Sequence, residues 1–165
     1  MEKGTQLRAI NTPGNGIGRQ RQHLYAAGFR QLNRAMDGGF YVEAIALCES
    51  LLSDRLEARR AWIANQEDSK RAFGTLGSLA RKLAGSSNKE REDPLETNKS
   101  LYKECIAWAD SRNKAIHEMF KLPEEGHVGW ETRYASLQII AEQGVKLARK
   151  VSAAVKKSNT PKIDL

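Results

Sequence analysis

The stretch from Leu95 to Lys121 repeats apolar residues with the period of an α-helix. On a helical wheel drawn at about 100° per residue, these apolar side chains all fall within roughly 60° of Cys105. They are Leu101, Cys105, Trp108, Ala109, Ile116, Met119 and Phe120. The stretch therefore predicts a long amphipathic helix whose apolar stripe must be covered by other helices.

Arg112 interrupts this apolar stripe, because it lies about 20° from Cys105 on the same wheel. An unpaired guanidinium buried at such a position costs several kcal/mol. We therefore expect Arg112 to contact a carboxylate, a set of carbonyl oxygens, or a phosphate of another molecule. The candidate carboxylates are Glu43 and Glu49, which border the apolar face of a long helix expected earlier in the chain.

Polar side chains line one edge of the stripe. Asn113 and His117 are four residues apart and lie roughly 80 to 120° from Cys105, with Asp110 beside them. Arg112 and His117 are five residues apart, hence about 140° apart on an unbroken helix. For both to contact one small ligand, the helix must end or bend here, or a second subunit must supply another copy. A two-fold dimer would bring two Arg/Asn/His sets into a single cleft.

The rest of the chain contains four further helical patterns separated by Gly, Pro and polar residues. They predict helices over about 20–36, 40–65, 75–83 and 130–157. Their connections are short enough for antiparallel neighbours, so we expect an all-α, antiparallel up-down bundle of four to five helices. The chain divides into a flexible basic tail (1–19), a single helical domain (20–158) and a short C-terminal tail (159–165).

Local roles are expected for several other side chains. Asp93 is placed to cap the helix that contains Arg112, with Pro94 in its first turn. The cluster Arg55, Arg59 and Arg60 is typical of a solvated helix face, and a contact with nucleic acid is the alternative.

In the helix over 20–36, the residues expected to face inward are Leu24, Tyr25, Gly28, Leu32, Ala35 and Met36. Cys48 and Cys105 lie on apolar faces without the spacing of metal ligands, so we expect both to fill space and no metal to be bound.

The chain is strongly basic, with a formal net charge of +7 and a pI near 9.5. This charge suits a polyanionic partner such as nucleic acid, although a basic structural protein would show the same balance. We find neither a signal peptide nor an apolar run of the roughly 18 residues that a membrane span needs. The expectation is a cytoplasmic protein without a membrane partner.

The sequence from Arg112 to His117, RNKAIH, resembles the R-N-x-x-x-H form of the R-x4-6-H motif of HEPN domains. These are small helical domains found in many RNA-cutting toxins and antiviral systems. Two earlier stretches fit in order: residues 39–52 resemble the helix that commonly precedes the motif, and residues 73–79 resemble the connecting FGxL element. The three stretches cover most of the chain between about residues 39 and 121.

One position departs from a branch of that family. Toxins paired with minimal nucleotidyltransferase antitoxins usually carry Tyr two residues after the His, and this chain has Met119 there. Tyrosine-dependent inactivation is therefore not expected, and a partner of that type is disfavoured.

The resemblance implies a metal-independent endoribonuclease in which Arg112, Asn113 and His117 are the catalytic residues. It implies no cofactor, RNA as substrate, and a homodimer that acts as a toxin or antiviral effector under an antitoxin or other regulatory protein. An imidazole can move the proton of the 2′-OH or of the leaving 5′-oxygen, while a guanidinium stabilises charge on the phosphorane. Asn113 would orient the His or the phosphate. The products would carry 2′,3′-cyclic phosphate and 5′-hydroxyl ends, and DNA would be spared.

Two alternatives remain open at this point. The chain could be a catalytically inactive HEPN-like module that binds nucleotide, RNA or a protein. Arg112 would then pair with Glu43 or Glu49, Asn113 would cap locally, and His117 would pack near the helix end. It could also be a helical scaffold unrelated to HEPN domains, which would be a monomer without affinity for RNA.

Overall fold

The computed structural model describes residues 16–64, 74–85, 92–121, 126 and 128–159. Within these ranges the regular structure is entirely α-helical, which confirms the predicted all-α bundle. The helices are α1 (Ile17–Asp37), α2 (Tyr41–Ile63), α3 (Leu76–Leu83), α4 (Glu96–His117) and α5 (Trp130–Ser158). Because α1 begins at Ile17, residues 17–19 are helical and not part of a tail. The remainder of the predicted N-terminal tail, residues 1–15, and residues 160–165 lie outside the described residues.

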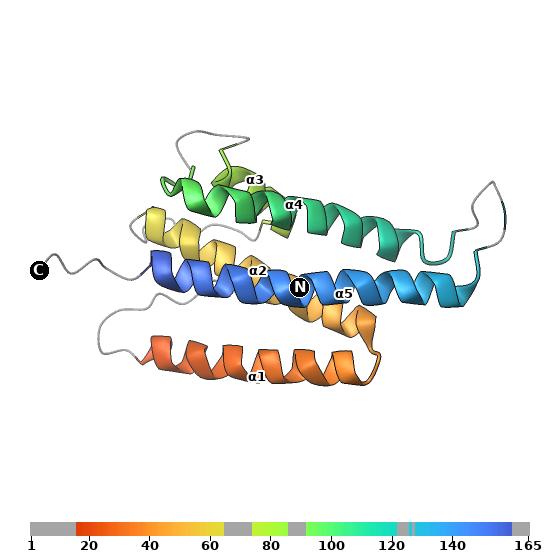
Figure 1. Ribbon diagram of the computed structural model, residues 1–165. Helices are drawn as coiled ribbons and strands as arrows, with labels where there is room; N and C mark the ends of the chain where they lie inside the picture. The colour runs from red at the N-terminus through yellow and green to blue at the C-terminus, as the bar shows by residue number, and fades with distance from the viewer. Residues whose placement is uncertain (1–15, 65–73, 86–91, 122–125, 127, 160–165) are drawn as a thin grey trace, which may run out of the picture.

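The long helices alternate in direction (Figure 1): α1 and α4 run one way, and α2 and α5 return. Helix α2 packs against α5, with α1 on one side of this pair and α4 on the other. The short α3 packs against α4 and α2. As a result, the last turns of α2 and α5 meet the first turn of α4 at one end of the bundle. The α1–α2 turn and the α4–α5 connection lie at the opposite end.

The core is built from apolar side chains contributed by all five described helices. Many of its fully enclosed aliphatic members come from α2 and α5. They include Ile45, Leu52, Leu56, Leu137, Ala141, Ala148 and Val151. The apolar period of these two helices therefore sets the central layer of the bundle.

Helix α4 is fixed to α5 through Trp108 and Gly144. A Cβ added at Gly144 would lie 2.7 Å from Trp108 Cζ2 and 3.1 Å from Cys48 Sγ, so no larger residue fits without a shift. The indole Nε1 of Trp108 donates a hydrogen bond to the carbonyl oxygen of Ile140 at 2.9 Å. This contact holds the helix that carries Arg112 in a defined register against α5.

The α1–α2 turn is also tied to α5. Gly39 has φ of 72°, a conformation that side-chain-bearing residues rarely adopt. The hydroxyl of Tyr134 on α5 donates to the carbonyl oxygen of Gly39, and the Tyr134 ring packs on Tyr41 with centroids 4.9 Å apart. The sequence Asp37-Gly38-Gly39 thus ends α1 where predicted.

Three local predictions are wrong. Leu24 is 73% exposed, because α1 lies at the edge of the bundle and buries only a narrow stripe. Phe120 is 86% exposed, because α4 ends before it. Pro94 is not in the first turn of α4: the helix begins at Glu96, and Asp93 is completely buried.

None of the described helices combines the length and the apolar character needed to cross a membrane.

Candidate functional site on helix α4

Helix α4 carries the three residues predicted to be catalytic, near its C-terminal end. It is continuous from Glu96 to His117, and the amide of Glu118 still donates to the carbonyl oxygen of Lys114 at 2.9 Å. His117 is the last helical residue, so α4 ends four residues before the end of the stretch from Leu95 to Lys121 that the sequence predicts to be helical. Because the helix is continuous between Arg112 and His117, these side chains leave it about 140° apart.

Arg112 is paired with Glu49 of α2. Its Nη2 donates to Glu49 Oε1, and the Arg112 side chain is 18% exposed. The Nε of Arg112 is buried and has no hydrogen-bond partner among the described residues. Of the two carboxylates left open by the sequence, Glu49 is therefore the partner. Glu43 instead accepts a hydrogen bond from Gln31 Nε2 at 3.0 Å.

Asn113 and His117 are exposed on the solvent side of α4. Neither side chain makes a hydrogen bond to the part of the chain that the structure describes. The local capping by Asn113 and the packing of His117 that a structural role would require are thus not found there. One turn of helix separates the two residues, so they form a short exposed polar strip.

The structure brings Asn113 and His117 together but turns Arg112 towards α2. Asp110, the other polar residue on this flank, lies near Arg81 of α3, with Nη2 and Oδ1 3.4 Å apart. A single chain therefore presents an amide and an imidazole to solvent, with a partly buried guanidinium beside them. The arrangement can bind an anion through Arg112 and transfer a proton through His117 only if a ligand or a second subunit bridges the angle between them.

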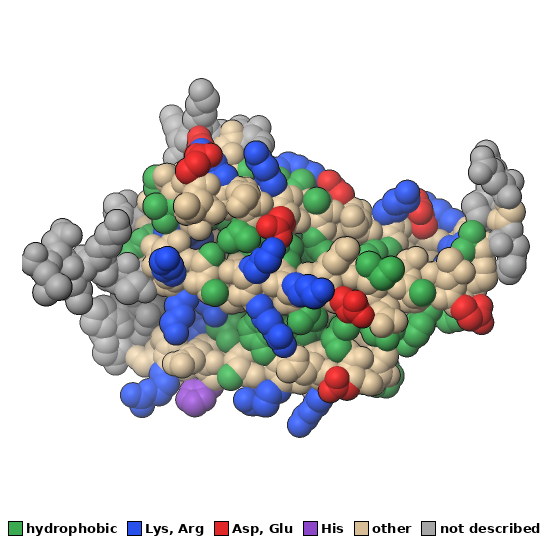
Figure 2. Space-filling model, in the orientation of Figure 1, with side chains coloured by type: hydrophobic (Ala, Val, Ile, Leu, Met, Phe, Trp, Pro, Cys, Tyr) green, Lys and Arg blue, Asp and Glu red, His purple; other side chains and the backbone are tan. Residues whose placement is uncertain are grey.

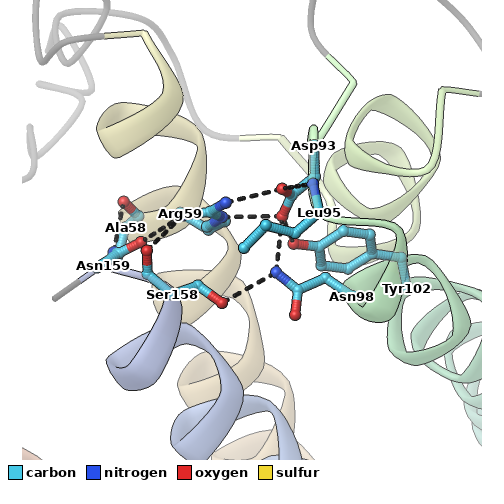
Figure 3. A network of polar contacts seen from close by, with 8 residues as sticks. All are labelled: Ala58, Arg59, Asp93, Leu95, Asn98, Tyr102, Ser158 and Asn159. Carbon is cyan, nitrogen blue, oxygen red and sulfur yellow. Dashed lines mark hydrogen bonds and ion pairs between the residues drawn. The ribbon is translucent and has the colours of Figure 1, made fainter. Parts of the chain in front are cut away.

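A larger polar cluster, which sequence reasoning missed, lies at the opposite end of α4 (Figure 3). Arg59 on α2 donates from Nε and Nη2 to the two carboxylate oxygens of Asp93, each at 2.8 Å. The same guanidinium donates from Nη1 to the carbonyl oxygen of Ser158 and to Asn159 Oδ1, each at 3.0 Å. Arg59 is only 3% exposed, so it is not the solvated arginine that the sequence predicts.

Asp93 is the centre of this cluster. Besides Arg59, its carboxylate accepts hydrogen bonds from the amide of Leu95 at 2.9 Å, from Asn98 Nδ2 at 3.0 Å and from the Tyr102 hydroxyl. Asn98 Nδ2 also donates to Ser158 Oγ at 3.1 Å. We call Arg59, Asp93, Asn98, Tyr102, Ser158 and Asn159 the buried network. It ties α2, α4 and α5 together.

The electrostatics of the buried network favour the charged pair. Burial alone would raise the pKa of Asp93, but hydrogen bonds from Arg59, Tyr102, Asn98 and Leu95 lower it to about 2. The hydrogen bond to Asp93 raises the pKa of Arg59, and burial together with the same carboxylate raises the pKa of Tyr102. Every partner of Asp93 stabilises its ionised form, which is the signature of a structural ion pair.

The two cysteines are free and buried, as predicted. Burial raises the pKa of each thiol to about 12, so both remain protonated at neutral pH. Among the described residues, no group of three or more His, Cys, Asp or Glu side chains is arranged to hold a metal ion.

Comparison with protein-family models, with curated proteins and with solved structures finds no match for this chain. The functional argument therefore rests on the residues themselves.

Proposed function

We propose that the protein is a metal-independent endoribonuclease that works as a homodimer and uses Arg112, Asn113 and His117. The observation that carries this proposal is the exposure of Asn113 and His117 one turn apart, with no hydrogen bond to the described part of the chain. Polar groups of this kind at the end of a well-packed helix are free to contact a substrate. The HEPN resemblance of the same three positions supplies the reaction class.

The reaction needs proton transfer at two oxygens of the RNA. The 2′-oxygen attacks the adjacent phosphorus and gives up its proton, while the bond from phosphorus to the 5′-oxygen breaks and that oxygen takes a proton. In the dimer, one copy of His117 accepts the first proton and the other copy donates the second. The products carry a 2′,3′-cyclic phosphate and a 5′-hydroxyl. The two copies of His117 account for both proton transfers, so the step needs no metal ion.

Arg112 has the capacity to bind a phosphate while it stays in contact with Glu49. Only its Nη2 is engaged by the carboxylate, and Nη1 has no hydrogen-bond partner among the described residues. A guanidinium presents its donors as a planar fork, so Nη1 can point at a phosphate oxygen while Glu49 fixes the plane. Charge that develops on the phosphorane is then stabilised by a group that is already oriented.

The angle between Arg112 and His117 supports the proposed homodimer. The two side chains diverge by about 140° within one continuous helix, so a single chain cannot aim both at one phosphate. Two-fold symmetry allows Arg112 of one subunit to share a phosphate with His117 of the other. The proposed cellular role is that of a toxin or antiviral effector in the cytoplasm, restrained by an antitoxin or another regulatory protein.

A second function is favoured by one observation, the ion pair between Arg112 and Glu49. This pair provides the counter-charge that a partly buried guanidinium at position 112 requires. In that case the chain is a catalytically inactive HEPN-like module that binds nucleotide, RNA or a protein.

The two proposals are separated by incubating mixed cellular RNA, in EDTA, with the wild-type protein and with His117→Ala, followed by analysis of the new RNA ends. Cyclic-phosphate ends made by the wild type and absent with His117→Ala are the expected result. If neither protein cuts, the inactive module is the better account. If both cut equally, the assignment of His117 is wrong.

A further inference from the structure

Two large aromatic side chains are stacked on the surface next to the proposed site. Phe120, just beyond α4, and Trp130, the first residue of α5, have ring centroids 6.0 Å apart and an interplanar angle of 26°. Phe120 is 86% exposed and Trp130 is 49% exposed. Figure 2 shows hydrophobic side chains reaching the surface along the N-terminal half of α5, with both basic and acidic side chains at the end of α4. We call these two residues the aromatic pair.

Packing does not account for the aromatic pair. The neighbouring tyrosine pair, Tyr41 and Tyr134, is less exposed, and its Tyr134 hydroxyl anchors the α1–α2 turn. Phe120 has no polar atom to anchor, and most of its surface faces solvent. Exposed aromatic surface of this kind lowers solubility, so its presence on a basic chain indicates a contact with a ligand.

The aromatic pair continues the polar strip of α4. Asn113, His117 and Phe120 occupy positions i, i+4 and i+7, which fall on one side of a helix. Past the last helical residue the backbone forms a turn, in which the amide of Met119 bonds to Ile116 and the amide of Lys121 bonds to Glu118. Phe120 therefore follows the proposed catalytic His117 by three residues, at the same end of α4.

Arg133 holds the backbone around Phe120 in place. Arg133 of α5 donates from its guanidinium to the carbonyl oxygens of Glu118 and Lys121, on either side of Phe120. Because these acceptors are neutral, the charge of Arg133 is not cancelled by them. Lys114 and Lys121 are exposed and pair with no described carboxylate.

We propose that the aromatic pair is a stacking surface for an unpaired base of single-stranded RNA, beside the phosphate that His117 acts on. Any base can stack on an exposed ring, and lysines beside it suit the phosphates on either side of that base. A duplex hides the faces of its bases, so paired RNA cannot use this surface. The inference rests on the proposed function for RNA as the nucleic acid, and it adds that cleavage occurs in single-stranded segments.

Binding of a labelled single-stranded RNA of about ten nucleotides, a length within the range covered by such surfaces, tests the proposal. Fluorescence anisotropy is measured with His117→Ala, so that no cleavage interferes. Adding Phe120→Ala or Trp130→Ala is expected to raise the Kd about tenfold. The matched control is Leu24→Ala, which also removes an exposed apolar side chain but from α1, and it should leave the Kd unchanged. The same sequence in a duplex should bind more weakly than the single strand.

Three results would overturn the proposal. The first is an unchanged Kd in both aromatic variants. The second is tighter binding of the duplex than of the single strand. The third is a change from dimer to monomer in Phe120→Ala by sedimentation velocity, which would make the pair a subunit interface. Loss of binding in the aromatic variants while the wild type cuts no RNA would support the stacking surface and refute the ribonuclease. Cleavage by the wild type together with an unchanged Kd in the aromatic variants would support the ribonuclease and refute the stacking surface.

Discussion

Arg59 binds Asp93 through two parallel hydrogen bonds of 2.8 Å, whereas Arg112 reaches Glu49 through one terminal nitrogen only. Arg59 also donates to two further oxygens at the end of α5, so all three nitrogens of its guanidinium are engaged. Arg112 keeps a buried Nε without a described partner. The two arginines therefore differ in what they can still do: Arg59 holds the bundle together, and Arg112 has donors left for a ligand.

Removing the carboxylate charge at the centre of the buried network should be costly. We expect Asp93→Asn to lower the free energy of unfolding by about 3–5 kcal/mol, because it leaves the buried Arg59 without a counter-charge. The control is Asp110→Asn, which removes an exposed carboxylate 3.4 Å from Arg81 and should cost about 1 kcal/mol or less. Urea unfolding of the three proteins measures both values. A similar small loss in the two variants would show that the buried network contributes little.

Acid should weaken the same ion pair. The pKa of Asp93 is lowered from its ordinary 3.8 to about 2, so its contribution to stability is complete above about pH 4. It is lost as the pH falls from about 4 towards 2, because the unfolded chain then binds the proton more readily than the folded one. The gap in unfolding free energy between wild type and Asp93→Asn should narrow by about 2 kcal/mol between pH 6 and pH 2. A gap that stays constant over this range would contradict the lowered pKa.

Two glycine substitutions on helices should have opposite effects. Gly144→Ala should lower the free energy of unfolding by about 1–3 kcal/mol, because its Cβ would lie 2.7 Å from the Trp108 ring. Gly28→Ala meets only Leu51 Cδ2 at 3.5 Å, so the better helix propensity of Ala should stabilise the protein by about 0.5–1 kcal/mol. Thermal or urea unfolding measures both. If Gly144→Ala were neutral, the docking of α4 on α5 through Trp108 would be looser than described.

The shape of the guanidinium at position 112 should matter for cleavage. Arg112→Lys keeps the positive charge and can still approach Glu49, but it loses the planar fork that holds a carboxylate and a phosphate together. We expect the rate of RNA cleavage to fall about a hundredfold while the melting temperature changes little. Unaltered cleavage by Arg112→Lys would mean that Arg112 does not contact the reacting phosphate.

The sequence predicted those features that depend on periodicity within one helix. The position of Arg112 on the helical wheel predicts a carboxylate, a set of carbonyl oxygens or a phosphate as its partner, and the structure shows the carboxylate of Glu49. Arg59 follows the buried Leu52 and Leu56 by seven and three residues, so the same helical period places it on an apolar face. Its membership of a basic cluster favours a solvated position instead, and that prediction is wrong.

Other features depend on contacts between segments and could not be read from a local pattern. Asp93 precedes α4 outside any periodic run, and its burial depends on how the segment before α4 meets α2 and α5. Phe120 continues the apolar period of α4 but lies past the helix end, where no described helix covers it. Contacts with a second subunit likewise depend on how two surfaces fit together, and the helical periodicity of one sequence does not predict them.

The central claim is that His117 cleaves RNA, and the initial rate of cleavage of a labelled single-stranded RNA in EDTA tests it most directly. The comparison is between the wild type, His117→Ala and His23→Ala, the last removing an exposed histidine of α1 as a matched control. We predict a loss of at least about a hundredfold in His117→Ala, since a general acid or base contributes that much or more, and no loss in His23→Ala. Equal rates in all three proteins would contradict the claim, as would the absence of cleavage by the purified wild-type protein.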